Sequence, residues 1–390
     1  MRVYFGVCGI GLGHVGRSAT LAKQFQKKGD KVLFSTYLDA IDYVKNEGFS
    51  LARAPALNYV IKPNGSIDLK RSSVYPGAFS VFIFLNQIRS EMQFMKAFDP
   101  DVVVSDTRGS SIVAAKTLGI PEVTILNQYK VNIPRTKRFL RLARIGDAYV
   151  LGLVGGLWAI GDRVIIPDFP KPHTISVENL RIPPVMERKV TYIGPIMDVN
   201  PVELPKKERL RKKLGLDNRP LIFAPISGSA MEKAHFIEIL QKILMSFPKE
   251  YQIVMSLGDP NSKIENWKNG NLHIYSWLTN RYEFLKTCDL IISRSGHGTI
   301  MQSITYGKPM ILIPTPNHTE QNNNAKRAEK LGVARVLSQK DLTHKRLLSF
   351  VNEAFTSKSL NDSVKYIQGE VEDYNGIDAA LDIITEVAAS

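Results

Sequence analysis

The chain has few cysteines, and this shortage excludes two classes of protein. Cys8 and Cys288 are the only cysteines in 390 residues, and both lie in or beside apolar, strand-like segments. A disulfide framework is therefore excluded, and packed thiols in a reducing cytoplasm are expected. No spacing typical of metal ligands occurs, so a structural metal domain is not expected either.

Long hydrophobic runs are also missing. The longest uncharged apolar segment, 148–160, contains three glycines and is too short to cross a hydrocarbon core of about 30 Å as a helix. The first residues, MRVYFGVCGIGLGH, are typical of a strand that enters a turn and lack the basic start of a signal peptide. We therefore expect a cytoplasmic protein.

Acidic side chains are scarce relative to basic ones, with 37 Asp and Glu against 51 Lys and Arg, and a formal net charge of +14. Such an excess favours nucleic acid, an anionic membrane or a polyphosphate ligand as partner. No nucleic-acid recognition motif is present, so nucleic acid is not expected. Basic residues, among them Arg138 and Arg141, precede the apolar run, which favours peripheral docking on the inner face of the cell membrane. The alternative is a helix with a solvated basic face.

The remaining sequence alternates strand-like and helix-like segments, which predicts the α/β class with doubly wound parallel sheets. A proline-rich, charged stretch at 192–215 indicates a linker followed by a short basic helix. We expect domains at 1–195 and 196–366, and a C-terminal helix at 367–390 that packs back on the first domain. The strands are expected at 3–7, 31–36, 101–105, 122–126, 220–224, 252–256, 272–275, 289–293 and 310–314, and the helices at 16–28, 38–47, 110–118, 232–245 and 281–287.

The segment 293–325 joins an anion-binding turn to a polar cluster. Gly296 and Gly298 follow a buried strand, and helical spacing begins at Thr299. Such a turn directs backbone N–H groups and the positive end of a helix at its ligand, and Arg294 and Thr299 add donors suited to phosphate. The turn therefore predicts a diphosphate site.

Side chains that suit a polyol gather near this turn. Glu320, Gln321 and Asn324 precede or open a helix and offer both donors and acceptors to hydroxyl groups, although Asn324 is equally suited to cap that helix. A second phosphate-binding turn is expected at Ser227, Gly228 and Ser229, after the strand 220–224.

The first strand leads into Gly9-Ile10-Gly11-Leu12-Gly13-His14. This turn lacks the last glycine of a dinucleotide fingerprint, and no acidic residue ends the next strand, so NAD binding is disfavoured. His14 can accept a proton near neutral pH, and Asp106 ends a strand whose carboxyl end borders the same edge of the sheet. The alternatives are a structural histidine at a helix start and an Asx turn at Asp106.

The order strand, SGxGT, helix, GxP, strand, EQxxNA, helix resembles the donor half of GT-B glycosyltransferases. It is most similar to the inverting enzymes that use UDP-sugars, including the lipid II N-acetylglucosaminyltransferases and the UDP-glycosyltransferases. Gly194-Pro195 matches the pair that often marks the crossing between their domains. The resemblance implies two Rossmann-like domains that face each other across a cleft, with the acceptor bound by the first and the nucleotide-sugar by the second.

The resemblance also implies roles for residues. His14 would be the catalytic base and Asp106 its orienting carboxylate, and no metal or other cofactor is implied. Gln302 departs from the family, which usually has a ribose-binding glutamate there. The acceptor side would include Gly11, Gly13, Arg138 and Arg141. The donor would be bound by Ser227, Gly228, Ser229, Trp277, Leu278, Arg294, Gly296, His297, Gly298, Thr299, Gln302, Glu320, Gln321 and Asn324, with Trp277-Leu278 against the uracil ring or, alternatively, in the core.

The acceptor is expected to be a lipid or lipid-linked saccharide, bound by the basic residues and by an aromatic-rich segment at 78–95. That segment is equally suited to be a buried helix. Two other functions stay open on the same fold. A nucleotide-sugar hydrolase or 2-epimerase would use Asp106, His297 and Glu320, and a non-catalytic nucleotide-sugar-binding subunit would bind without turnover.

Overall fold

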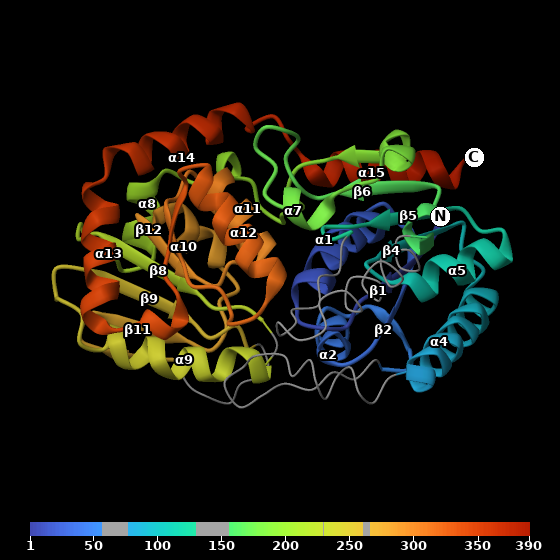
Figure 1. The fold of residues 1–390 in the computed structure, drawn as a ribbon, viewed down its shortest axis with the longest axis horizontal. Coiled ribbons are helices and arrows are strands. Elements are labelled where there is room, and N and C mark those ends of the chain that lie inside the picture. The colour runs from blue at the N-terminus through green and yellow to red at the C-terminus, as the bar shows by residue number, and fades with distance from the viewer. Residues whose placement is uncertain (57–76, 130–155, 229, 260–265) are drawn as a thin grey trace, which may run out of the picture. The chain divides into compact units, whose positions relative to one another are not determined.

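The structure is a computed structural model that describes residues 1–56, 77–129, 156–228, 230–259 and 266–390. The chain divides into two compact units. In the described residues, the first comprises 1–56, 77–129, 156–196 and 374–390, and the second 197–373. Each is a mainly parallel sheet covered by helices (Figure 1), and the sequence predicts this α/β architecture.

The sheet of the first unit has the strand order β3-β2-β1-β4-β5-β6-β7, and all neighbouring strands are parallel. Its helices are α1 (Gly13–Lys27), α2 (Asp39–Asn46), α4 (Gly77–Phe98), α5 (Gly109–Leu118), α7 (Val177–Leu180) and α15 (Gly376–Ala388), with a 3-10 helix at Pro184–Lys189. Its strands are β1 (Arg2–Val7), β2 (Lys31–Thr36), β3 (Ser50–Arg53), β4 (Val102–Asp106), β5 (Glu122–Ile125), β6 (Arg163–Ile166) and β7 (Val190–Tyr192).

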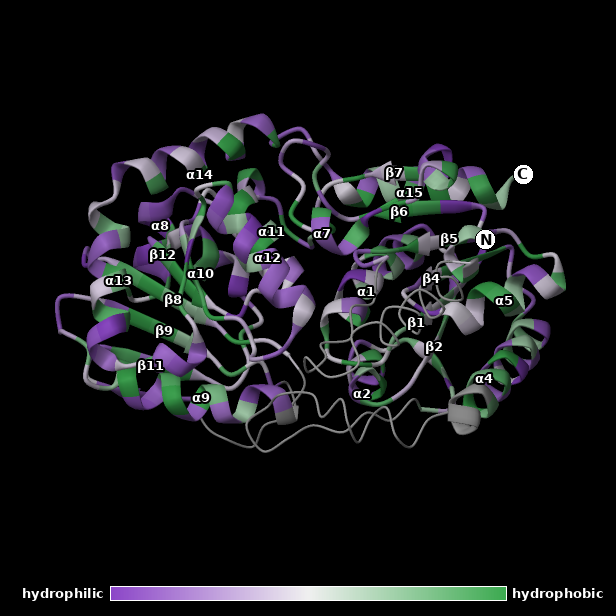
Figure 2. Ribbon diagram, viewed as in Figure 1, coloured by the Kyte–Doolittle hydropathy of each residue, from purple (hydrophilic) through white to green (hydrophobic). Residues whose placement is uncertain are grey.

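Both faces of this sheet are buried, because side chains alternate along each strand. Val3 and Phe5 on β1 pack with α1, α2 and α15, whereas Tyr4 between them packs with Met95 on α4. Helices therefore cover both faces, and the strands are mainly hydrophobic (Figure 2). This double cover leaves the carboxyl ends of the strands as the natural location for a site.

The sheet of the second unit has the order β10-β11-β9-β8-β12-β13-β14, in which the β10–β11 pair is antiparallel. Ile222 on β8 packs with α9 and α13, and its neighbour Phe223 stacks on Phe284 of α10. The strands are β8 (Leu221–Pro225), β9 (Gln252–Ser256), β10 (Trp267–Asn269), β11 (Leu272–Tyr275), β12 (Leu290–Ser293), β13 (Met310–Leu312) and β14 (Ala334–Val336). The helices are α8 (Lys207–Lys213), α9 (Ala230–Leu244), α10 (Arg281–Thr287), α11 (His297–Thr305), α12 (Thr319–Lys330), α13 (His344–Thr356) and α14 (Lys358–Glu370), with 3-10 helices at Pro201–Glu203 and Gln339–Asp341.

Several predicted boundaries were wrong by a few residues. The first helix begins at Gly13 rather than at residue 16, and the helix after β12 begins at His297 rather than at Thr299. Asp106 and Asn324 lie inside elements, at the end of β4 and within α12, so Asn324 is not a helix cap. The side chain that caps α12 is His318. The segment 78–95 is helical, but Phe82 and Leu85 of α4 are exposed, so it is not a plain buried helix.

No helix in the described ranges is both long and apolar enough to cross a membrane. Cys8 and Cys288 are free thiols, as expected.

The two chain crossings next to the boundary between the units pass close together within the first unit. A β-carbon on Gly194 would lie 2.6 Å from the Tyr374 β-carbon, and one on Gly376 would lie 2.5 Å from the Pro195 carbonyl oxygen. Gly194 also has a φ of +76°, which side-chain-bearing residues adopt at a cost. Glycine at position 194 is therefore required by both conformation and packing.

We expect Gly194→Ala to lower the free energy of unfolding by about 3 kcal/mol, because backbone strain adds to overpacking. The measurement is urea denaturation. Gly215→Ala is the matched control, since Gly215 has a φ of +65° but nothing within 4 Å of an added β-carbon. A cost equal to that of the control would contradict the role of packing.

Candidate active site

The carboxyl edge of the first sheet brings His14 and Asp106 together. Parallel pairing sets Val7 opposite Asp106, so the turn after β1 begins beside the last residue of β4. That turn needs glycine, because a β-carbon on Gly9 would lie 1.8 Å from the Tyr37 carbonyl oxygen and Gly11 has a φ of +68°. Gly13 then begins α1, and His14 lies in its first turn.

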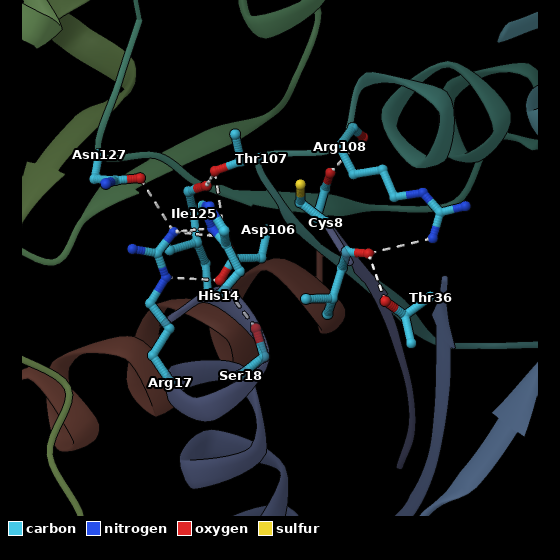
Figure 3. A network of polar contacts seen from close by, with 12 residues as sticks. Cys8, His14, Arg17, Ser18, Thr36, Asp106, Thr107, Arg108, Ile125 and Asn127 are labelled. Carbon is cyan, nitrogen blue, oxygen red and sulfur yellow. Dashed lines mark hydrogen bonds and ion pairs between the residues drawn. The ribbon is translucent and has the colours of Figure 1, made fainter. Parts of the chain in front are cut away.

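His14 Nδ1 lies 2.8 Å from Asp106 Oδ1 (Figure 3). The Asp106 side chain is fully buried and that of His14 is 23% exposed. An ionised Asp106 accepts the Nδ1 proton, which leaves Nε2 with its lone pair as the basic atom of the ring. The geometry is that of a general base with an orienting carboxylate. The prediction that the two residues meet is therefore confirmed.

Further polar groups that the sequence reading missed surround Asp106. Arg17 Nε donates to Oδ2 at 2.7 Å, and Ser18 Oγ donates to the same oxygen at 3.0 Å (Figure 3). Burial alone would raise the pKa of Asp106, but the charges of Arg17 and then His14 hold it well below the usual range. The sequence feature that could have identified Arg17 is its i, i+3 spacing from His14. This spacing places both residues on one helix face once the helix begins at Gly13.

A second buried charge supports the same edge. Arg108 Nη1 donates to the carbonyl oxygens of Ser35 at 2.7 Å and Val7 at 3.4 Å, where β2 and β1 end. Its Nη2 pairs with Glu91 Oε1 of α4, and Tyr4 and Ser35 donate to the same carboxylate. The Arg108 guanidinium and the Glu91 carboxylate in this network both have hydrogen-bond partners, so the network fixes the strand ends that carry the His14 turn.

In the second unit, the turn after β12 is open at its glycines. Gly296 is the N-terminal cap residue of α11, and neither it nor Gly298 would place a β-carbon within 4 Å of another group. The first turn of α11 has no acidic residue and no side-chain cap, so no carboxylate of that turn offsets the positive end of the helix dipole. Thr299 and Gln302 follow on this helix and are half-buried.

Arg294 lies beneath this turn instead of at its surface. Its side chain is 2% exposed, stacks 3.8 Å from the Phe236 ring centroid and donates from Nη1 to the Ile313 carbonyl oxygen at 3.0 Å. Its Nε and Nη2 have no hydrogen-bond partner among the described residues. Burial lowers the pKa of Arg294 to about 10, and the Glu232 charge opposes that shift. The guanidinium therefore stays charged at neutral pH.

The polar residues predicted to bind a polyol form hydrogen bonds within the protein in part. Gln321 is 8% exposed, accepts from Thr315 N at 2.9 Å and donates to Glu232 Oε1 at 3.0 Å. Asn324 is buried and donates to the Ser295 carbonyl oxygen. Both amides order the loops around the turn, and sugar binding by them stays a prediction.

The other predicted donor residues lie on the same unit. Glu320 is half-buried at the start of α12, and His297, the first residue of α11, is 6% exposed. Trp277 is half-buried rather than part of the core, and Leu278 is buried beside it. Ser227 and Gly228 follow β8, and Gly228 has a φ of +126°. Ser229, Arg138 and Arg141 lie outside the described residues.

The fold and the two loops define a class of enzyme, and comparisons agree with it. Residues 1–195 match the model "Glycosyl transferase family 1", and residues 227–374 match "Glycosyltransferase family 28 C-terminal domain". The chain therefore belongs to the glycosyltransferases with the GT-B fold, and its second unit is of the family 28 type.

Similar proteins support this membership along the whole chain. An uncharacterized glycosyltransferase of Methanosarcina mazei is 26% identical over 393 residues, which cover 100% of this chain and 99% of the relative. A UDP-N-acetylglucosamine–N-acetylmuramyl-(pentapeptide) pyrophosphoryl-undecaprenol N-acetylglucosamine transferase of Bacillus cereus is 25% identical over 368 residues, with 90% of each chain covered.

Two solved structures have the same fold at low identity. The glycosyltransferase of kitacinnamycin superposes with a TM-score of 0.67 and 18% identity, covering 99% of this chain and 98% of its own. MurG of Acinetobacter baumannii superposes with a TM-score of 0.62 and 18% identity, covering 99% of both chains.

We expect Asp106→Asn to lower the free energy of unfolding at pH 7 by about 3 kcal/mol, because the half-enclosed Arg17 charge loses its counter-ion. The Asp106 pKa is depressed in the folded state, so its contribution is present above the unfolded pKa and is lost as the pH falls through the folded one. The variant should lack that part of the acid sensitivity.

Urea denaturation between pH 3 and pH 7 measures both effects. Asp217→Asn is the control, because Asp217 pairs with Arg219 at the surface and should cost about 0.5 kcal/mol. Equal costs for the two variants would contradict the special position of Asp106.

Proposed function

We propose that the protein is an inverting glycosyltransferase that moves a sugar from a nucleoside-diphosphate donor to a hydroxyl group of a lipid or lipid-linked saccharide. The donor that we propose first is a UDP-sugar. The observation that carries the proposal is the 2.8 Å contact between His14 Nδ1 and the buried Asp106, which leaves Nε2 as a base. The name of the Bacillus cereus relative, an N-acetylglucosamine transferase that uses a UDP-sugar and a pyrophosphoryl-undecaprenol acceptor, supports this donor and this acceptor class.

The proposed reaction is a single displacement. His14 Nε2 takes the proton of the acceptor hydroxyl as its oxygen attacks the anomeric carbon, and the bond from that carbon to the diphosphate breaks with its electron pair on the phosphate oxygen. The start of α11 and the Arg294 charge stabilise the departing diphosphate, so the proposal includes no metal ion. Attack opposite the leaving group inverts the anomeric centre.

Peripheral binding to the cytoplasmic face of the membrane is part of the proposal. Phe82 and Leu85 of α4 are 66% and 58% exposed, and Arg89, one turn further on, is exposed as well. Apolar side chains beside a cation suit an anionic lipid surface, where each basic residue contributes about 1 kcal/mol.

We expect His14→Gln to abolish transfer and to change the affinity for the nucleoside diphosphate by less than about threefold, roughly 0.7 kcal/mol. The base is lost, while the donor loops belong to the other unit. The assay combines a panel of radiolabelled nucleoside-diphosphate sugars with membrane lipid extracts, and calorimetry measures the affinity.

His344→Gln serves as the control, because His344 lies at the start of α13 and contacts Ser246 and Phe247. Retained turnover in His14→Gln would overturn the assignment of the base. Rapid release of nucleoside diphosphate without an acceptor would instead indicate a hydrolase.

Gly298→Asp should weaken the binding of UDP about tenfold, or 1.4 kcal/mol, because it adds a negative charge to the first turn of α11. Gly298→Asn has nearly the same shape without the charge and is the matched control, since a side chain at position 298 meets no protein atom within 4 Å of its β-carbon. Unchanged binding of UDP in Gly298→Asp would show that the helix end does not bind the diphosphate.

A further inference from the structure

The His14–Asp106 pair has a third charged member, Arg17. Its Nε donates to Asp106 Oδ2 at 2.7 Å and its Nη2 to Oδ1 at 2.5 Å, so the guanidinium holds the carboxylate with two parallel bonds. Nη2 also lies 3.0 Å from His14 Nδ1, but a guanidinium only donates, so this contact is not a hydrogen bond when Nδ1 carries its proton. One carboxylate oxygen, Oδ1, therefore faces both the imidazole and the guanidinium (Figure 3).

Among the described residues, the side chains that hydrogen-bond to this trio are neutral. Ser18 Oγ donates to Asp106 Oδ2, Thr107 Oγ1 donates to Oδ1 at 3.3 Å, and Asn127 Oδ1 accepts from Arg17 Nη2 at 3.4 Å. The Cys8 thiol interacts electrostatically with Asp106 and with Arg108, and the Cys8 backbone N donates to the Asp106 carbonyl oxygen at 3.1 Å. With a neutral His14, the charges of Asp106 and Arg17 sum to zero in an enclosed place, where a net charge is costly.

We propose that Arg17 is a positioning residue that keeps Asp106 ionised and His14 neutral. In this state the Nδ1 proton is directed at Asp106, and the Nε2 lone pair is open to the acceptor. This inference rests on the proposed role of His14 as the base. Arg17 contacts neither His14 Nε2 nor the acceptor oxygen in the proposed reaction, and it acts through the Asp106 carboxylate.

Removal of the guanidinium leaves the pair with a net charge of −1 around a fully buried carboxylate. The pair then binds one more proton, either as imidazolium with carboxylate or as neutral imidazole with carboxylic acid. In the first form both ring nitrogens carry protons, and in the second the acid donates to Nδ1 and the ring proton lies on Nε2. Both forms occupy the atom that would accept the acceptor's proton, so the base is lost in either case.

The sign of the pH effect follows from this coupling. Arg17 favours the unprotonated pair, so without it the pair binds its proton at a higher pH. The fall of kcat/KM on the acid side should therefore move to higher pH in Arg17→Met and in Arg17→Gln. At pH 7 these variants should lose at least tenfold in kcat/KM and regain most of it at alkaline pH, whereas KM for the donor should hardly change.

Arg17→Lys keeps the charge and should leave the acid-side fall near its wild-type position. Arg17→Gln keeps one hydrogen bond to Asp106, so it provides an uncharged variant if Arg17→Met does not fold. Lys23→Met is the matched control, because Lys23 also lies on α1 and pairs with Glu47 away from the site. An unmoved acid-side fall in both uncharged variants, or an equal shift in Arg17→Lys, would overturn the proposal.

A measurement on the resting protein separates this inference from the proposed function. Nitrogen-15 NMR of the His14 ring, assigned with His14→Gln, reports which ring nitrogen carries the proton at each pH. The wild type should hold the proton on Nδ1 at pH 7, and Arg17→Gln should show a protonated Nε2. If His14→Gln retains turnover, the proposed function fails while this result still stands; an unprotonated Nε2 in Arg17→Gln overturns the inference alone.

Discussion

The buried charge of Asp106 is the constraint on which the first unit's site depends. A carboxylate with no solvent exposure is stable only with partners for its lone pairs, and its partners here come from both ends of the first turn of α1. Its backbone oxygen also accepts from Cys8 N at 3.1 Å, which ties the β1 turn to the end of β4. The position of His14 is therefore set before any ligand binds, which is the condition for effective general-base catalysis.

The second unit has a buried positive charge at the corresponding edge of its sheet, where the first unit has a buried carboxylate. Arg294 is a buried cation whose Nη1 is paired and whose face is covered by Phe236. In the part of the chain that the structure describes, its Nε and Nη2 lack hydrogen-bond partners. Unpaired buried donors cost about 1–3 kcal/mol each, and stacking on a ring offsets part of that cost. Arg294 therefore places a positive charge beneath the turn, which the Glu232 carboxylate offsets in part, and this charge agrees with a proposed anionic ligand.

Most of the fold, and the meeting of His14 with Asp106, could be predicted from the sequence. Alternating strands and helices define two doubly wound sheets, and parallel strands whose carboxyl ends share an edge bring the His14 turn to Asp106. Arg17 was missed because the first helix was placed to begin at residue 16, which hides the shared face of His14 and Arg17. The Glu91–Arg108 pair was missed for another reason, since a buried ion pair has the same residue types as a solvated surface.

Gln321 illustrates a limit of the opposite kind. Residue type and spacing correctly indicated a cluster of amides, but the hydrogen bonds of Gln321 go to Thr315 and Glu232, and only tertiary packing decides whether an amide faces a ligand or a neighbouring loop. Gln302 lies half-buried on α11 near the same turn, and the chain has an amide there where the resemblance leads one to expect a carboxylate.

Several of the basic side chains behind the net charge of +14 are paired with carboxylates. Arg17 and Arg108 are balanced by Asp106 and Glu91, and the basic helix α8 pairs through Lys207 with Asp289 and through Lys213 with Glu283. Paired cations attract an anionic surface weakly, because their fields largely cancel beyond a Debye length of about 8 Å. The proposed attraction to a membrane therefore needs other basic residues, and α4, with exposed apolar side chains and the exposed Arg89, is the element of the first unit that we propose for this contact.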